Sequence, residues 1–216
     1  MAKGDDVKDC LACCLALFMF AAAILLVILI VLVLVYGCVD PVEVTVEEAS
    51  LGRLALPAPP AAGRNGTTSP ASLAYNLSLA VSVRNPNWAN RVWRTAPLDA
   101  ELRLAGTPFA VVRLAGAEEE LIRPERSAVY RVVAAAESAA VALGSDEQAE
   151  FARESGVGLF RLELVVSGEL KYQGESYRRS FTVRCPLKLP LSTAPTAVAF
   201  ARVERTLPPQ ECVYVN

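Results

Sequence analysis

The sequence predicts an all-β domain, an antiparallel β-sandwich of about seven strands with one short helix, which follows a single transmembrane α-helix. Two observations lead to this expectation. Residues 10–39 contain no charged side chain and are rich in Leu, Val, Ile, Ala and Phe. Most of the chain after them alternates apolar and polar residues, which is the period of half-buried strands, and short turn signals separate the alternating segments.

The apolar segment is long enough to cross a membrane, because a bilayer core needs about 20 apolar residues in helical conformation. Residues 15–36 are the best window, and residues 24–35 have no polar face, which argues against a helix at the surface of a soluble protein. A cleaved signal peptide is the competing interpretation, but its apolar region usually has only about 7 to 15 residues. We therefore expect an uncleaved signal anchor over residues 15–39.

The charges that flank this segment predict its orientation. Lys3 and Lys8 precede it, and the first basic residue after it is Arg53. Basic residues mark the cytoplasmic side of a membrane span. The sequence therefore predicts a cytoplasmic tail at residues 1–14 and an external domain at residues 40–216.

The composition argues against several classes of function. The chain contains no histidine, which removes Ser-His-Asp catalysis, Cys-His catalysis and histidine metal sites. Its formal net charge of −2 lacks the basic excess of nucleic-acid-binding proteins. We expect a non-enzymatic protein without catalytic residues, cofactor, metal site or nucleic-acid partner.

The cysteines divide according to the predicted topology. Three lie at the cytoplasmic edge of the span, namely Cys10, Cys13 and Cys14. They are either sites of S-palmitoylation or simply small apolar residues of the span. Cys38, at the outer edge, is free, lipidated or bridged to a second copy of the chain. Cys185 and Cys212 lie in the domain assigned to the oxidising side, so we expect them to form a disulfide.

The external chain begins with an alternating strand at residues 42–47, followed by a Pro-rich and Gly-rich loop at residues 57–70. This loop contains Asn65 in an Asn-Gly-Thr acceptor for N-glycosylation. The clearest strand covers residues 73–84. It carries a second acceptor at Asn76, which the alternation places on the solvent face.

A turn at Asn85-Pro86-Asn87 ends this strand, because proline cannot donate to a strand ladder and asparagine readily closes turns. Trp88 and Trp93 follow it. Two interpretations of these tryptophans remain open, burial at the edge of the sandwich and contact with a partner or with lipid.

The second half of the domain continues the same pattern. Further strands are expected at 98–104, 109–114, 160–172 and 177–185, with a solvated acidic run at 118–120 and an extended or helical segment at 127–143. Ser145 is expected to cap a short helix that reaches about Glu154 and ends at Gly156. Four basic residues are expected to share one outer face of the sheet, namely Lys171, Arg178, Arg184 and Lys188.

Several of these features together resemble a known family. They are the cysteine-bearing tail, the single span, the strand at 73–84 with Asn85-Pro86-Asn87 after it, and Phe181-Thr182-Val183-Arg184-Cys185. Over nearly its full length the chain resembles the plant harpin-induced and non-race-specific-disease-resistance-like proteins, whose external part is a late-embryogenesis-abundant type-2 domain. Family members often carry tyrosines before the next strand, where this chain has Arg91-Val92-Trp93-Arg94.

The resemblance implies a fibronectin-III-like sandwich at the plasma membrane and a link to pathogen or stress responses, with no catalytic residues to carry over. The expected function is a membrane-anchored, non-enzymatic binding and signalling component of plant defence or stress response. The alternative is a structural or protective role, either adhesion of membrane to cell wall or stabilisation during water deficit. An unidentified protein or a cell-wall or lipid surface is the expected partner, and association of two copies through the span or Cys38 remains open.

Overall fold

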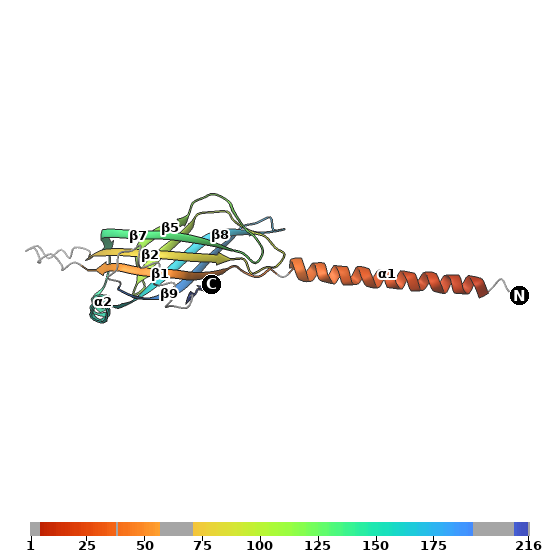
Figure 1. Ribbon diagram of the computed structural model, residues 1–216, viewed down its shortest axis with the longest axis horizontal. Helices are drawn as coiled ribbons and strands as arrows, with labels where there is room; N and C mark the ends of the chain where they lie inside the picture. Colours follow the sequence, from red (N-terminus) through yellow and green to blue (C-terminus); the bar gives the residue numbers. More distant parts are fainter. Residues whose placement is uncertain (1–4, 38, 57–70, 192–209, 216) are drawn as a thin grey trace, which may run out of the picture. The chain divides into compact units, whose positions relative to one another are not determined.

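The computed structural model describes residues 5–37, 39–56, 71–191 and 210–215. The chain forms two compact units, Met1–Asp40 and Pro41–Asn216. Helix α1 belongs to the first unit, and the described strands and helix α2 belong to the second (Figure 1).

Helix α1 (Asp5–Gly37) is apolar on all sides along its middle. Every residue of Leu15–Val33 is exposed, and this segment is long and apolar enough to cross a membrane. The helix begins before the predicted span, so the tail cysteines Cys10, Cys13 and Cys14 lie within it. The structure therefore has an N-terminal apolar helix that is compatible with a signal anchor or a signal sequence.

The second unit consists of two antiparallel sheets and one short helix among its described residues. Seven strands are long: β1 (Glu43–Ala55), β2 (Ala71–Arg84), β4 (Leu98–Leu104), β5 (Thr107–Ala115), β7 (Ser127–Val141), β8 (Leu159–Tyr172) and β9 (Arg179–Pro190). Four are short: β3 (Val92–Arg94), β6 (Glu120–Ile122), β10 (Gln210–Glu211) and β11 (Val213–Tyr214). The expected antiparallel sandwich is confirmed.

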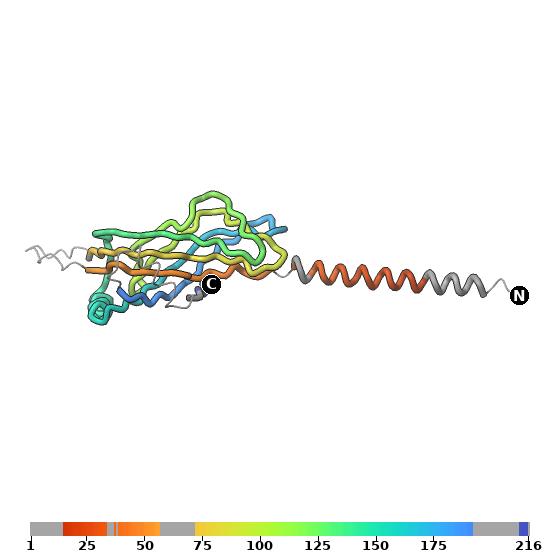
Figure 2. Tube along the Cα trace, in the orientation of Figure 1, coloured from red at the N-terminus to blue at the C-terminus, as the bar shows by residue number. Residues whose placement is uncertain are grey.

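The smaller sheet has the order β10-β1-β2-β7, and the larger has the order β11-β9-β8-β3-β6, with β4 pairing with β8 and β5. Figure 2 shows the strands of the smaller sheet crossing in front of β8 and β9. Inward residues of the long strands form the core, as the alternation predicts. Ala100 and Leu102 of β4 and Phe160 of β8 are each 0% exposed. Phe160 also packs against Phe151 of α2, with ring centroids 5.5 Å apart.

Strand β2 is buried on both faces, which corrects the expectation of a solvent-exposed face. Ser78 is 0% exposed and Ser82 is 3% exposed. The strands on either side carry longer side chains on this outer face, including Glu48 of β1 and Arg131 of β7, whose charged groups lie 4.0 Å apart. These two residues are the cross-strand neighbours of Ala80. They therefore cover the small side chains of β2 from both sides.

Helix α2 (Ser145–Val157) differs from the prediction at both ends. Gly144 is its N-cap and no side chain caps the first turn, so the expected cap at Ser145 is wrong. The helix passes through Gly156 and ends at Gly158, whose φ of 72° lies in the left-handed region. The backbone N–H of Gly158 donates to the carbonyl of Glu154 at 2.8 Å, which closes the last turn.

Three other expectations are decided by strand pairing. Residues 127–141 are extended and pair with β2, so the helical alternative for that segment is wrong. Glu120 belongs to β6 and is not part of a fully solvated run. The strand expected at 177–185 begins only at Arg179, and Tyr177, before it, is 56% exposed.

Candidate functional site

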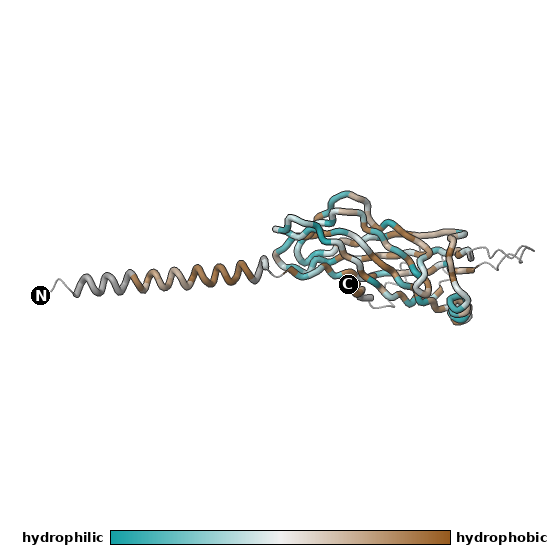
Figure 3. Tube along the Cα trace, turned by 180° about the vertical axis from the view of Figure 1, so that it is seen from behind, coloured by the Kyte–Doolittle hydropathy of each residue, from teal (hydrophilic) through white to brown (hydrophobic). Residues whose placement is uncertain are grey.

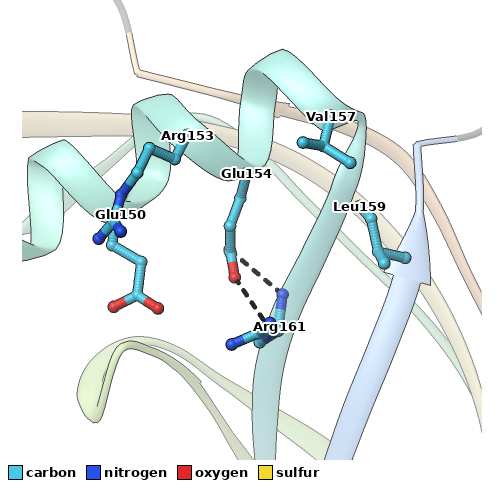
Figure 4. A pocket seen from close by; sticks show the side chains of 6 residues that line it. All are labelled: Glu150, Arg153, Glu154, Val157, Leu159 and Arg161. Atoms are coloured by element: carbon cyan, nitrogen blue, oxygen red, sulfur yellow. Dashed lines mark hydrogen bonds and ion pairs between the residues drawn. The ribbon is translucent and has the colours of Figure 1, made fainter.

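A shallow pocket of about 210 Å³ lies where α2 meets the start of β8. Its lining residues come from these two elements: Glu150, Arg153, Glu154, Val157, Leu159 and Arg161. Figure 4 shows the carboxylate of Glu154 directed at Arg161. This carboxylate accepts a hydrogen bond from the backbone N–H of Arg161 at 3.2 Å and lies 3.9 Å from its guanidinium. Glu154 and Arg161 are therefore paired with each other inside this pocket.

A cluster of polar side chains joins β3, β6 and β7. Tyr130 donates a hydrogen bond to the carboxylate of Glu120 at 2.8 Å, and burial together with this bond raises the pKa of Tyr130 to about 12. Arg94, which is 4% exposed, donates to Ala96 O at 2.7 Å and to Glu120 at 3.4 Å. Its guanidinium also lies 5.9 Å from the centre of the Tyr130 ring. These contacts tie three strands together, and a phenol with this pKa stays protonated near neutral pH.

In the described part of the chain, no group of three or more Cys, Asp or Glu side chains is arranged to hold a metal ion. The expected basic face is also interrupted by acids. Arg184 lies 4.0 Å from Glu163, and Arg178 lies 3.9 Å from Glu169. The outer face of the larger sheet is therefore a mixed surface of exposed ion pairs, each of which contributes little to stability.

The Asn85-Pro86-Asn87 motif forms a buried hydrogen-bonded clamp. The side-chain amide of Asn85 donates to Asn90 O at 2.8 Å and to Ile122 O at 3.2 Å. Its carbonyl oxygen accepts from the backbone and side-chain N–H groups of Asn87 at 3.1 and 2.9 Å. The backbone N–H of Asn85 donates to Arg126 O at 2.9 Å. Asn85 thus fixes the loop after β2 against the connection between β6 and β7.

This clamped loop presents Trp88 to solvent. Trp88 is 67% exposed, so the burial interpretation is wrong for this residue. Trp93 lies half-buried in β3, between its cross-strand neighbours Leu121 of β6 and Lys171 of β8. The two tryptophans therefore have different environments, and only Trp88 is presented for contact.

The predicted disulfide between Cys185 and Cys212 is confirmed. Its Cα atoms lie 4.2 Å apart, and Cys185 is fully buried in β9. The backbone N–H of Cys212 donates to Val44 O of β1 at 3.2 Å, while the next residues pair with β9. The bond thus fastens the C-terminal segment at a point where it touches both sheets.

Of the two expected glycosylation acceptors, Asn76 lies among the described residues. Asn76 points to the outer face of β2 but is only half-exposed, and its Oδ1 atom is buried without a hydrogen-bond partner. Its cross-strand neighbours are Arg53 and Ala135. Asn76 therefore lies on the outer face of β2, as the alternation predicts, but its neighbours leave its side chain only half-exposed. Asn65 and Cys38 lie outside the described residues.

No protein-family model matches the chain, and no curated protein matches it. A crystal structure of a protein from Archaeoglobus fulgidus is similar to this chain. The match covers 72% of this chain and 100% of the archaeal chain, with 10% sequence identity and a TM-score of 0.30. At this identity and TM-score the likeness assigns neither a family nor an activity.

Proposed function

We propose that this chain is a membrane-anchored, non-enzymatic binding and signalling component of plant defence or stress response, with its β-sandwich held outside the cytosol at the plasma membrane. The observation that carries the proposal is the segment Leu15–Val33, in which every residue is apolar and exposed. A helix that is apolar all round needs lipid or another helix around it. Figure 3 shows this segment in shades of brown, the colours of hydrophobic residues.

The disulfide supports an external position for the domain. Disulfides persist outside the cytosol and are rare within it. Cys185 and Cys212 are bonded in the described domain, and Lys3 and Lys8 precede the apolar segment. Both observations favour a cytoplasmic N-terminus and an external C-terminal domain.

The assignment to plant defence rests on the resemblance described above. The residues that carry it include Asn85, Asn87 and Cys185, and each has a structural role in the sandwich. The resemblance therefore supports the type of domain directly and the defence role by association. The binding role is favoured by Trp88, a large exposed side chain on a loop held rigid by buried hydrogen bonds.

The test compares the anchored chain with an unanchored variant in leaf cells. Ile28→Arg with Leu32→Arg places two charges in the span, each costing about 3 kcal/mol on insertion scales. We expect wild-type chain, tagged at both ends, to lose its C-terminal tag to protease added outside intact protoplasts. We also expect it to enhance the oxidative burst that follows an immune elicitor, and we expect the double variant to do neither. Ile28→Leu with Leu32→Ile is the matched control and should behave as wild type.

The results of this test decide separately on the topology and on the signalling role. Protection of the C-terminal tag would contradict the topology, and an unchanged oxidative burst at normal surface levels would contradict the signalling role. The protective alternative predicts weak, unsaturable binding of the surface-exposed chain to wall polymer. A signalling component instead predicts saturable cross-linking to a discrete protein.

A further inference from the structure

Four separate segments of the sandwich meet at the end where β1 begins. They are the start of β1 (42–43), the loop 85–91, the connection 123–126 and the turn 173–179, and we call this surface the β1-entry end. Hydrogen bonds join its parts: Asn85 N to Arg126 O at 2.9 Å, Gln173 N to Arg91 O at 2.9 Å, and Val42 N to the Tyr172 hydroxyl at 3.3 Å. Figure 2 shows the three connections gathered at this end of the sheets.

The β1-entry end carries exposed aromatic side chains. Trp88 is 67% exposed and Tyr177 is 56% exposed. Tryptophan and tyrosine are the residues that gather at the headgroup level of membranes, where an apolar ring and a polar tip are both accommodated. The clamp built by Asn85 holds the Trp88 loop in place, so little conformational entropy remains to be lost when the ring makes contact.

The same end has a local excess of positive charge. Its four segments contain five arginines and three glutamates, although the whole chain has a formal net charge of −2. Arg178 and Arg179 pair with Glu169 and Glu175. The other three arginines of these segments are exposed and have no ion pair among the described residues: Arg91, Arg123 and Arg126. Arginine is well suited to bind phosphate oxygens through its paired N–H groups.

The covalent chain ties this end to the membrane that α1 would occupy. Helix α1 ends at Gly37 and β1 begins at Glu43, so five residues separate them. Such a segment reaches at most about 22 Å when fully extended, at about 3.6 Å per residue step. A short tether raises the effective concentration of lipid at this end far above that of any free partner.

We propose that the β1-entry end docks on the headgroup layer of the membrane that holds α1. Trp88 enters the interfacial region, and the exposed arginines Arg91, Arg123 and Arg126 bind lipid phosphates. This inference rests on the anchoring proposed above. The surface is a lipid-recognition site, and its ligand is the phosphate of phospholipid headgroups, because the guanidinium of arginine pairs with phosphate oxygens through its N–H groups.

The chain offers its own reporter, because it contains two tryptophans. Trp93→Phe leaves Trp88 as the fluorescent residue, and Trp88→Phe leaves the half-buried Trp93 as the matched control. The full chain of each variant is reconstituted in vesicles of phosphatidylcholine with phosphatidylglycerol, in which some lipids carry a nitroxide on the headgroup. We expect the Trp88 chain to lose most of its emission to the nitroxide and to resist quenching by aqueous iodide. The Trp93 chain should keep most of its emission in the same vesicles.

Charge substitutions test the role of the arginines. Arg123→Ser with Arg126→Ser removes two positive side chains, while the Arg126 carbonyl that Asn85 uses remains in place. We expect this variant, in the Trp93→Phe background, to lose much of its nitroxide quenching and to regain iodide quenching. Raising the salt concentration should act in the same direction on the parent chain, because screening weakens contacts between arginine and phosphate.

Flotation of the vesicles separates the two proposals. A chain that does not float with the vesicles overturns the anchoring, and the docking with it. A chain that floats while Trp88 stays open to iodide and unquenched by the nitroxide overturns the docking alone. Protection of Trp88 in native membranes but not in pure lipid vesicles also overturns it, in favour of a protein partner at the same surface.

Discussion

At the scale of single residues, Asn85 has all of its side-chain hydrogen-bonding groups engaged while being 0% exposed. Replacing a buried amide of this kind lowers the free energy of unfolding, because the groups that were hydrogen-bonded to it cannot bond to water instead. In this chain those groups include the carbonyls of Asn90 and Ile122. The choice between an amide and a carboxylate at position 85 therefore decides whether the loop after β2 can close.

The first prediction follows from this arrangement. Asn85→Asp replaces the donor that serves Asn90 O and Ile122 O with a carboxylate. We expect a loss of about 3 kcal/mol in the free energy of unfolding, since two hydrogen bonds are lost and a negative charge is buried without a positive partner. Thermal unfolding of the full chain in detergent micelles, followed by near-ultraviolet circular dichroism, measures it. Asn76→Asp, beside Arg53 on a half-exposed face, is the control and should lose much less.

A second prediction concerns the alkaline limit of stability. Burial and the hydrogen bond to Glu120 raise the pKa of Tyr130 from 10.0 to about 12. The folded state therefore keeps this proton over a pH range in which the unfolded chain has released it, and the stabilisation is complete below pH 10 and is lost as pH rises from about 10 to 12. We expect the wild-type chain to lose about 1 to 3 kcal/mol more over this range than Tyr130→Phe. Equal losses in urea unfolding would show that Tyr130 is not responsible.

At the scale of elements, two nearby glycines of α2 have opposite roles. Gly156 lies inside the helix, whereas Gly158 ends it with a φ of 72°, and an added Cβ would meet nothing within 4 Å at either position. Backbone conformation alone therefore distinguishes them. We expect Gly158→Ala to lower the free energy of unfolding by about 1 kcal/mol and Gly156→Ala to raise it by a similar amount. A loss of stability at Gly156 would contradict the assigned end of the helix.

The same pair of glycines shows where sequence reasoning works and where it stops. The acidic first turn and the glycine-rich end predict a helix at this place. Which glycine ends the helix, Gly156 or Gly158, depends on which backbone carbonyl accepts the hydrogen bond that closes the last turn. Alternation over seven residues correctly predicts β4, with Ala100 and Leu102 facing inward. Strands β3 and β6 have three residues each, which is too short for a period to appear.

The candidate surfaces depend still more on long-range contacts. Local chemistry predicts a turn at Asn85-Pro86-Asn87, yet the partner that makes it a clamp, Ile122, lies 37 residues away. The exposure of Trp88 follows from that clamp. The burial of both faces of β2 likewise depends on side chains of β1 and β7, and the sequence of β2 alone contains no sign of them.

At the scale of the whole domain, the disulfide fixes a C-terminal segment whose described residues are held otherwise by two short strands and a few hydrogen bonds. Cys185 and Cys212 are separated by 27 positions, and the chain-entropy model gives about 3 to 4 kcal/mol for closing such a loop. We expect Cys185→Ser with Cys212→Ser to lose roughly this amount. A reducing agent should lower the unfolding temperature of wild type and leave that of the double variant unchanged. Equal stability of the two chains under oxidising conditions would contradict this role.

The pairing of the C-terminal residues has a consequence for self-association. Strand β10 covers the outer edge of β1 at Thr45 and Val46, and β11 covers the outer edge of β9 at Val183 and Arg184. Without these short strands, the peptide groups of β1 and β9 would be open to pairing with a strand from another molecule. The C-terminal segment therefore occupies these edge positions of both sheets, and its removal would leave the peptide groups there open to a strand from another molecule.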